Sequence, residues 1–205
     1  MPSDAQATPP EDAQRDRVAE FHRLHESGTF VMPNPWDAGS AVVMEQLGFP
    51  ALASTSAGAA WTVGRPDNGL TLQLALDHLR TLTAVVSVPV NADFEGGYAV
   101  DPEGVHSNVT LATDTGVAGL SIEDSSRDPD EPLFDFDLAV ERVAAARQAI
   151  DDSGTGVLLT ARTEGFVVGR PDLDETVRRL QAFAEAGADC LYAPRLGTVE
   201  QITAV

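Results

Sequence analysis

Two carboxylates placed two residues apart, Asp93 and Glu95, are the feature of this sequence that points most directly to chemistry. They follow an apolar run that reads as a short buried strand, and they precede Gly96 and Gly97, which favour a turn. Side chains alternate between the two faces of a strand, so residues i and i+2 point the same way. A hard cation such as Mg²⁺ takes oxygen ligands from one or two carboxylates and leaves its other positions to water and substrate. The pair is therefore either a metal site or two solvated acids at a strand end.

Polar side chains also stand directly after most of the other apolar runs, which favours the metal site. They are Asn34, Thr55–Ser56, Glu123–Asp124, Arg162 and Arg195. Taken alone, Asp67 reads as a turn residue in a loop rich in Gly, Pro and Asn. Taken alone, Glu123 fits a solvated acid and a functional acid equally well. Taken together, four carboxylates could converge on one Mg²⁺ directly or through water: Asp67, Asp93, Glu95 and Glu123.

Arg162 directly follows an apolar run, and a partly buried guanidinium needs an anionic partner. Two acids of the chain could supply it, Glu164 and Glu123, in a purely structural role. The third partner is the carboxylate of a substrate, which an arginine can hold with two parallel hydrogen bonds.

Composition excludes several classes of function. The 205 residues carry a formal net charge of −19, so nucleic acid and anionic membrane surfaces are poor partners. A small anionic substrate requires a metal ion and an arginine to reverse the local field. Cys190 is the only cysteine, which excludes a disulfide framework and makes the cytoplasm the expected location. No apolar stretch is long enough to span a bilayer, and residues 1–10 are expected to be a disordered lead-in.

The expected elements alternate along the chain. Six apolar runs read as strands: 29–33, 49–54, 88–93, 117–122, 156–161 and 189–193. Helices are expected between and around them, at 11–26, 37–47, 71–86, 101–116, 138–150 and 172–185 and from about 198. The stretch Thr55–Ala60 is made of small residues, and Thr55–Ala57 within it is expected to be a loop.

Strict alternation of apolar strands and helices predicts an α/β fold with a parallel sheet. A doubly wound open sheet and a (β/α)₈ TIM-type barrel both fit. The barrel is favoured because it gathers all its strand ends on one face, whereas an open sheet gathers only those beside a switch point. Only about six βα units are present where a barrel needs eight, so residues 11–205 are expected to form a single incomplete barrel domain. Either the chain is a shortened form or another subunit completes the barrel.

Five stretches, in this order and spacing, make the sequence resemble the isocitrate lyase/phosphoenolpyruvate mutase superfamily over roughly residues 30–196. They are Phe30–Met32 with Gly39–Ala41, Thr55–Gly58 through Gly64–Asp67, Asp93–Tyr98, Ser121–Asp124 and Ala161–Glu164. The resemblance implies a barrel of the phosphoenolpyruvate-binding type, Mg²⁺ (with Mn²⁺ as an alternative) as cofactor, and a homo-oligomer, a dimer or a tetramer.

The resemblance also implies roles for individual residues. Asp93 matches the direct Mg²⁺ ligand, Glu95 stands where the family usually has an aspartate, and Asp67 and Glu123 match acids that hold metal-bound water. Arg162 matches an arginine that faces the substrate. Thr55, Ser56 and Ala57 match the segment that holds the substrate carboxylate.

The departures from the family narrow the expected reaction. The loop 125–130 contains neither the acid/base cysteine of the isocitrate-cleaving lyases nor the lysine and asparagine of the mutases. Cleavage of a 2-hydroxy acid needs such a base, whereas decarboxylation of a 2-oxo acid mainly needs a metal that stabilises an enolate. We therefore expect a Mg²⁺-dependent carbon–carbon lyase for a small 2-oxo dicarboxylate, of the oxaloacetate decarboxylase type. In it Arg162, Glu95 and Glu123 serve catalysis, and Tyr98 and Glu164 are candidate proton donors. The alternatives are a phosphonomutase or phosphonopyruvate-type enzyme acting on a C–P bond, and a catalytically silent metabolite-binding barrel.

Overall fold

A computed structural model describes residues 11–205; the expected lead-in, residues 1–10, lies outside the described residues. The five strands of this part of the chain follow the order β1-β2-β3-β4-β5 in one sheet. They are β1 (Leu52–Ala53), β2 (Val90–Asp93), β3 (Gly119–Glu123), β4 (Leu158–Arg162) and β5 (Cys190–Tyr192).

The sheet has the connectivity of a β/α barrel. Strand β1 pairs with β2 in parallel, with Leu52 opposite Val90, and β4 pairs with β5 in parallel, with Thr160 opposite Cys190. At least one helix separates each pair of successive strands. A sequential order with helical crossovers lacks the reversal that defines a doubly wound sheet. The prediction of an α/β fold of the incomplete TIM-barrel type is confirmed, with five strands rather than six.

Apart from α3, which was not predicted, the helices begin and end close to the predicted positions. Asp37 and Asp172 each accept a hydrogen bond from the backbone N–H three residues later, which caps the helix that follows. The helices are α1 (Glu11–His25), α2 (Ala38–Gln46), α3 (Ser56–Thr62), α4 (Leu72–Val85), α5 (Pro102–Thr113), α6 (Phe136–Ser153), α7 (Leu173–Glu185) and α8 (Val199–Ala204).

Two predictions about local structure were wrong. Residues 29–33 form no strand: Val31 is exposed, Pro33 has no N–H to donate, and Pro33 O accepts one bond, from Ala53 N–H at 3.1 Å. The stretch after Thr55 is not a loop but helix α3, because Thr55 caps it and small residues allow it to pack closely.

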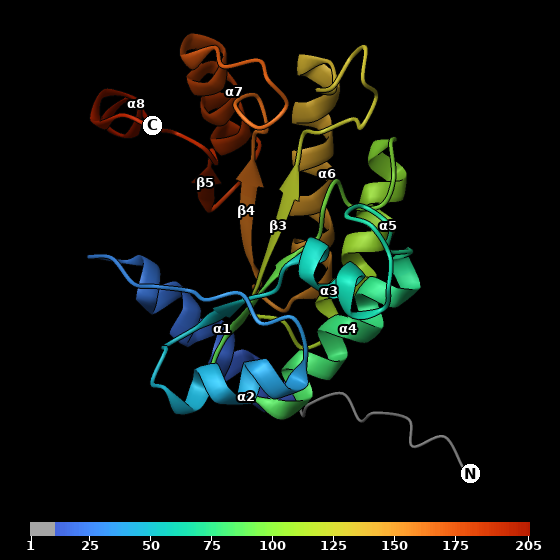
Figure 1. Ribbon diagram of the computed structural model, residues 1–205, viewed down its shortest axis with the longest axis vertical. Coiled ribbons are helices and arrows are strands. Elements are labelled where there is room, and N and C mark those ends of the chain that lie inside the picture. The colour runs from blue at the N-terminus through green and yellow to red at the C-terminus, as the bar shows by residue number, and fades with distance from the viewer. Residues whose placement is uncertain (1–10) are drawn as a thin grey trace. The chain divides into compact units, whose positions relative to one another are not determined.

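The chain divides into two compact units. The first contains the described residues up to Asp93 together with 110–120 and 153–158, and the second contains 94–109, 121–152 and 159–205. The core of the first unit includes Ala41, Leu52, Leu82, Val86 and Val90, so α2 and α4 bury their apolar sides against β1 and β2. In the second unit α7 contacts β5, and Figure 1 shows the two elements next to each other.

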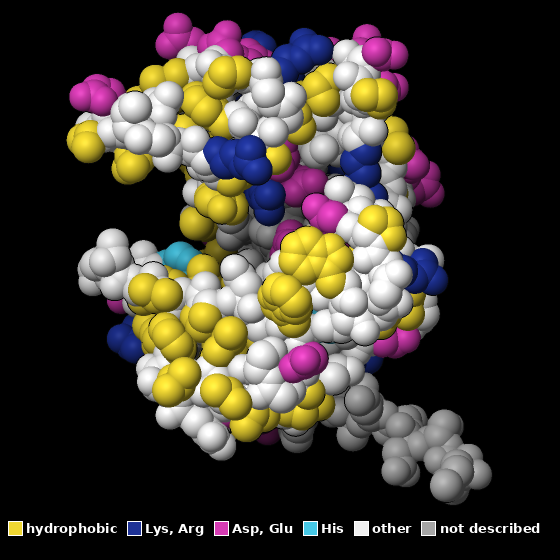
Figure 2. Space-filling model, in the orientation of Figure 1, with side chains coloured by type: hydrophobic (Ala, Val, Ile, Leu, Met, Phe, Trp, Pro, Cys, Tyr) yellow, Lys and Arg dark blue, Asp and Glu magenta, His cyan; other side chains and the backbone are white. Residues whose placement is uncertain are grey.

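Helix α2 also carries apolar side chains on its outer side. Val43, on α2, and Leu47, directly after it, are more than half exposed, whereas Ala41 is fully buried. Figure 2 shows hydrophobic side chains gathered over this helix. Among the described residues no helix is both long enough and apolar enough to cross a membrane.

Candidate active site

Asp93 ends β2 and is held from two sides within the first unit. The backbone N–H and the hydroxyl of Ser56 both donate to Asp93 Oδ2, each at 2.9 Å. The backbone N–H of Asp93 donates to the hydroxyl of Ser54 at 2.8 Å. These contacts fix the direction of the Asp93 side chain. The structure therefore presents Asp93 as an oriented carboxylate at the end of a strand.

The predicted substrate-binding residues stand at the start of α3. Thr55 is the residue before the helix, and its hydroxyl accepts a hydrogen bond from Gly58 N–H at 3.2 Å. Ser56 and Ala57 are the first two helical residues. Thr55 thus fixes the turn of chain that carries the Ser56 donors to Asp93.

Asp67 lies in a turn of its own. Its Oδ1 accepts a hydrogen bond from Asn68 N–H at 2.8 Å, and Gly69 N–H closes the turn onto Pro66 O at 2.9 Å. Its side chain is exposed. The contacts of Asp67 are those of a turn residue, and its proposed role with metal-bound water remains a prediction.

Glu95 and Glu123 are neighbours in the second unit. Glu123 N–H donates to Glu95 O at 2.9 Å. The Glu95 side chain is buried, with 2% exposure, and forms an ion pair with Arg127 from the loop after β3. The positive φ of Glu95, 49°, is uncommon for a residue with a side chain and marks the turn after β2 as constrained. No sequence pattern indicates the contact between Arg127 and Glu95, because it joins two loops.

Arg162 is the last residue of β4, and it contacts both of the acids predicted as its partners, Glu123 and Glu164. Its Nε donates to Glu164, and the same Nε lies 3.6 Å from Glu123 Oε2. The guanidinium carbon also lies 5.4 Å from the ring centre of Tyr192, within the range of a cation–π contact. Arg162, Glu123 and Glu164 therefore form one charged cluster at the ends of β3 and β4.

Arg142, on α6, is a positioning residue that the sequence did not reveal. It is almost completely buried, and its guanidinium donates to the backbone oxygens of Gly96, Ala99 and Val100. It also lies over the ring of Phe134, 4.0 Å from its centre. Burial lowers the pKa of Arg142 to about 10, against the opposing pull of Asp101 and Asp124. The turn that carries Glu95 is therefore fixed by a buried cation.

Asp124 follows Glu123 and points into the protein. Burial raises the pKa of Asp124, and hydrogen bonds from Glu164 N–H, Thr163 and Arg179 act in the opposite direction. Glu123 and Asp124 are adjacent in sequence but have different partners: Glu123 lies near Arg162, and Asp124 pairs with Arg179.

The candidate ligands are all carboxylate oxygens, the donors that Mg²⁺ and Mn²⁺ prefer, so their chemistry fits a hard divalent ion. The structure links Asp93 to Ser56 in one unit, and Glu95, Glu123 and Arg162 in the other. Within residues 11–205, no three His, Cys, Asp or Glu side chains are clustered closely enough to hold a metal ion. Metal binding by these acids therefore remains a proposal.

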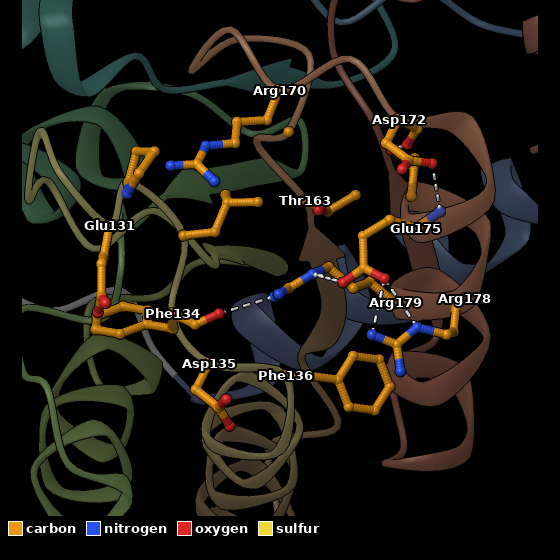
Figure 3. Close-up of a pocket in the computed structure, with 14 residues that line it drawn as sticks. Glu131, Phe134, Asp135, Phe136, Thr163, Arg170, Asp172, Glu175, Arg178 and Arg179 are labelled. Carbon is orange, nitrogen blue, oxygen red and sulfur yellow. Dashed lines mark hydrogen bonds and ion pairs between the residues drawn. The ribbon is translucent and has the colours of Figure 1, made fainter.

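The second unit also contains a cavity of about 500 Å³. Figure 3 shows Arg170, Thr163, Glu175 and Arg179 among the side chains around it. None of the four predicted metal ligands lines it. It lies between the loops that follow β3 and β4 and the start of α7.

Comparison with known proteins identifies the class. A family model described as phosphoenolpyruvate phosphomutase matches residues 21–205. The chain belongs to this family, within the isocitrate lyase/phosphoenolpyruvate mutase superfamily, as the five sequence stretches indicated.

Two curated relatives have the same level of identity to this chain. An uncharacterized Mycobacterium tuberculosis protein is 32% identical over 85% of this chain and 64% of its own length. An oxaloacetate decarboxylase from Paraburkholderia xenovorans is 32% identical over 94% of this chain and 64% of its own length. The chain thus spans somewhat less than two thirds of the length of these relatives.

Solved structures agree with the fold. A candidate lyase/mutase from Burkholderia cenocepacia is 44% identical, with a TM-score of 0.93 over 95% of this chain and 70% of that one. A phosphonopyruvate hydrolase solved with oxalate and Mg²⁺ is 27% identical, with a TM-score of 0.80 over 95% of this chain and 66% of that one.

Proposed function

We propose that this protein is a Mg²⁺-dependent lyase that decarboxylates a small 2-oxo dicarboxylate, as an oxaloacetate decarboxylase does. The observation that carries the proposal is the Asp93 carboxylate, which two Ser56 donors orient at the end of β2. Support comes from the family and from a relative that is an oxaloacetate decarboxylase.

In this proposal Asp93 is the direct ligand of the divalent ion, with Mn²⁺ as an alternative to Mg²⁺. Glu95, Glu123 and Asp67 orient water around it. The ion supplies an electron sink for the negative charge that develops on the 2-oxo oxygen as the C–C bond breaks. A family member solved with oxalate and Mg²⁺ supports this choice of cofactor.

In this proposal residues of the chain bind the substrate carboxylate and supply a proton. Arg162 holds a substrate carboxylate, with its Nε fixed by Glu164 so that the plane of the guanidinium is set before binding. The segment Thr55–Ala57 contacts the substrate at the start of α3 through donors other than those of Ser56, both of which bind Asp93. Tyr98 and Glu164 are the candidates that return a proton to the carbon left after CO₂ departs.

The loop after β3 favours decarboxylation over cleavage of a hydroxy acid. Removal of a hydroxyl proton requires a positioned base, and residues 125–130 contain no cysteine, histidine or lysine. Arg127, the cation of this loop, is engaged by Glu95. Loss of CO₂ needs no such base.

The direct test is turnover of oxaloacetate, followed as pyruvate by a coupled dehydrogenase, with a blank without protein because free Mg²⁺ also promotes the reaction. The account predicts turnover that chelation abolishes and that Asp93→Ala reduces by at least roughly a hundredfold. Asp77→Asn, at an exposed acid on α4, is the matched control and should retain full activity. Equal turnover by wild type and Asp93→Ala would refute the assignment.

A second candidate is cleavage or rearrangement of a C–P bond. The description of the matching family and the likeness to phosphonopyruvate hydrolase favour it. Phosphorus NMR of phosphonopyruvate incubated with the protein and Mg²⁺ distinguishes the two, since only this candidate changes the phosphonate signal. Oxalate binding without turnover of either substrate would support a silent binding protein. A homo-oligomer and a cytoplasmic location remain predictions.

A further inference from the structure

Asp124 joins three segments of the second unit through one buried carboxylate. It is only 3% exposed. Its Oδ1 accepts from Glu164 N–H at 2.8 Å, and its Oδ2 accepts from the Thr163 hydroxyl at 2.8 Å and from Arg179 Nη1 at 3.2 Å. The carboxylate thus binds the two residues that directly follow Arg162.

Arg179 anchors this carboxylate from α7. Its Nη1 also donates to Phe134 O at 3.0 Å, and its Nε donates to Glu175 Oε1 at 2.8 Å. Figure 3 shows the guanidinium between these two partners at the wall of the cavity. Since its contacts come from a helix and a loop, the position of Arg179 is fixed independently of β4.

Asp124 contacts the backbone both at Arg162 and just after it. Asp124 N–H donates to Arg162 O at 3.2 Å, while the Asp124 side chain holds the backbone of Glu164. Glu164 in turn receives the Nε of Arg162. We propose that Asp124, anchored by Arg179, is a positioning residue that sets the direction of the Arg162 guanidinium and of the Glu164 carboxylate. The inference rests on the proposed function, in which Arg162 holds the substrate.

Asp124→Asn tests this with the smallest change of shape. An amide has one acceptor oxygen where the carboxylate has two. If that oxygen keeps the Glu164 N–H, the amide NH₂ faces Arg179 and two donors meet. If it keeps Arg179, the NH₂ faces Glu164 N–H instead. In the first case the anchor to Arg179 is lost, and in the second case the contact to the backbone of Glu164 is lost.

The chain offers a matched control at the other end of the same strand. Asp189 Oδ2 accepts from Leu159 N–H at 2.8 Å and from Arg147 Nη1 at 3.1 Å. Like Asp124, Asp189 connects a backbone N–H to an arginine of a helix. The difference is the position of that N–H, which belongs to Leu159, three residues before Arg162, and not to Glu164, two residues after it. Asp189→Asn should therefore reduce stability without altering substrate binding.

The experiment measures steady-state kinetics with oxaloacetate and the Nε–H resonance of Arg162, assigned by its absence from Arg162→Lys. For Asp124→Asn we expect KM to rise roughly tenfold, with kcat within about threefold of wild type, because substrate binding is weakened before the chemical step. The Arg162 resonance should move. Asp189→Asn should leave both unchanged. Arg179→Met should repeat the effect, and the double variant should add little to it, because the two residues act as a unit.

The two ideas fail differently. If wild type turns over oxaloacetate and Asp124→Asn has the same KM and the same Arg162 resonance, the positioning role is wrong and the proposed function stands. If wild type does not act on oxaloacetate, the proposed function is wrong, and the resonance alone decides: a shift in Asp124→Asn but not in Asp189→Asn supports positioning, and no shift overturns it.

Discussion

Ser56 donates its backbone N–H and its hydroxyl to the same oxygen of Asp93, Oδ2, each at 2.9 Å. The two residues are 37 positions apart, and the contact joins the start of α3 to the end of β2. Two donors on one oxygen fix the rotation of the carboxylate. Outer contacts of this kind orient a metal ligand and tune its affinity.

Replacement of Ser56 by alanine removes the hydroxyl contact and keeps the backbone one. We expect the Mg²⁺ concentration for half-maximal activity to rise roughly 10- to 100-fold, the usual cost of losing a group that orients a ligand. Ser40→Ala is the control, since the Ser40 hydroxyl caps α2 and touches no candidate ligand. An unchanged Mg²⁺ dependence in Ser56→Ala would show that the contact does not serve the metal.

Gly58 should be intolerant of alanine although it lies in a helix. A Cβ there would lie 2.6 Å from Trp36 Cδ1 and 2.7 Å from Thr55 Cγ2. Alanine normally stabilises a helix over glycine by about 1 kcal/mol, but overpacking costs about 1–3 kcal/mol. Gly58→Ala should thus lower the free energy of unfolding in urea and weaken Mg²⁺ binding through Ser56. Gly39→Ala, whose Cβ would make only an ordinary 3.4 Å contact, should do neither.

Arg142 should contribute strongly to stability. Its removal leaves the carbonyl oxygens of Gly96, Ala99 and Val100 without their donor; the bond to Gly96 is buried and the other two are partly buried. A buried unsatisfied group costs about 1–3 kcal/mol. We expect Arg142→Met to lower the free energy of unfolding by about 3 kcal/mol or more, measured by urea denaturation. Arg142→Lys keeps the charge but has fewer donors, so its free energy of unfolding should lie between those of wild type and Arg142→Met. A loss below about 1 kcal/mol for Arg142→Met would contradict the assigned role.

His78, on α4, should make stability depend on pH. Burial lowers its pKa below the ordinary value of 6.5, with Asp37 opposing the shift, and its Nε2 is buried without a hydrogen-bond partner. Below pH 6.5 the unfolded chain therefore binds a proton that the folded protein resists. The free energy of unfolding should decrease as pH falls from about 6.5 toward the lowered pKa, and His78→Gln should remove that part of the decrease. Parallel stability curves for the two proteins from pH 7.5 to 5 would contradict this.

Helix positions could be predicted because their signals are local. Asp37 and Asp172 are N-cap residues that predict the starts of α2 and α7, and both helices form there. Residues 29–33 have the apolar composition of a strand, yet whether a strand forms depends on hydrogen bonds to another segment, which composition does not encode. Helix α3 was missed because its small residues fit a loop equally well.

The candidate site was predictable only in part, for the same reason. Acids at strand ends can be read from the sequence, and Glu123 and Glu164 do contact Arg162. The roles of Arg142 and Arg179 cannot be read from the sequence in this way. Both lie on helices that look amphipathic, and the bonds from Arg142 to Val100 and from Arg179 to Asp124 span 42 and 55 residues. A buried arginine bound to backbone oxygens leaves no motif.

The most direct test of the account is a crystal structure of the protein with Mn²⁺ and oxalate, with the anomalous signal of the metal used to locate it. The account predicts one ion within about 2.0–2.2 Å of an Asp93 carboxylate oxygen, with oxalate on the same ion and against Arg162. An ion bound elsewhere, or oxalate bound away from both Asp93 and Arg162, would contradict it.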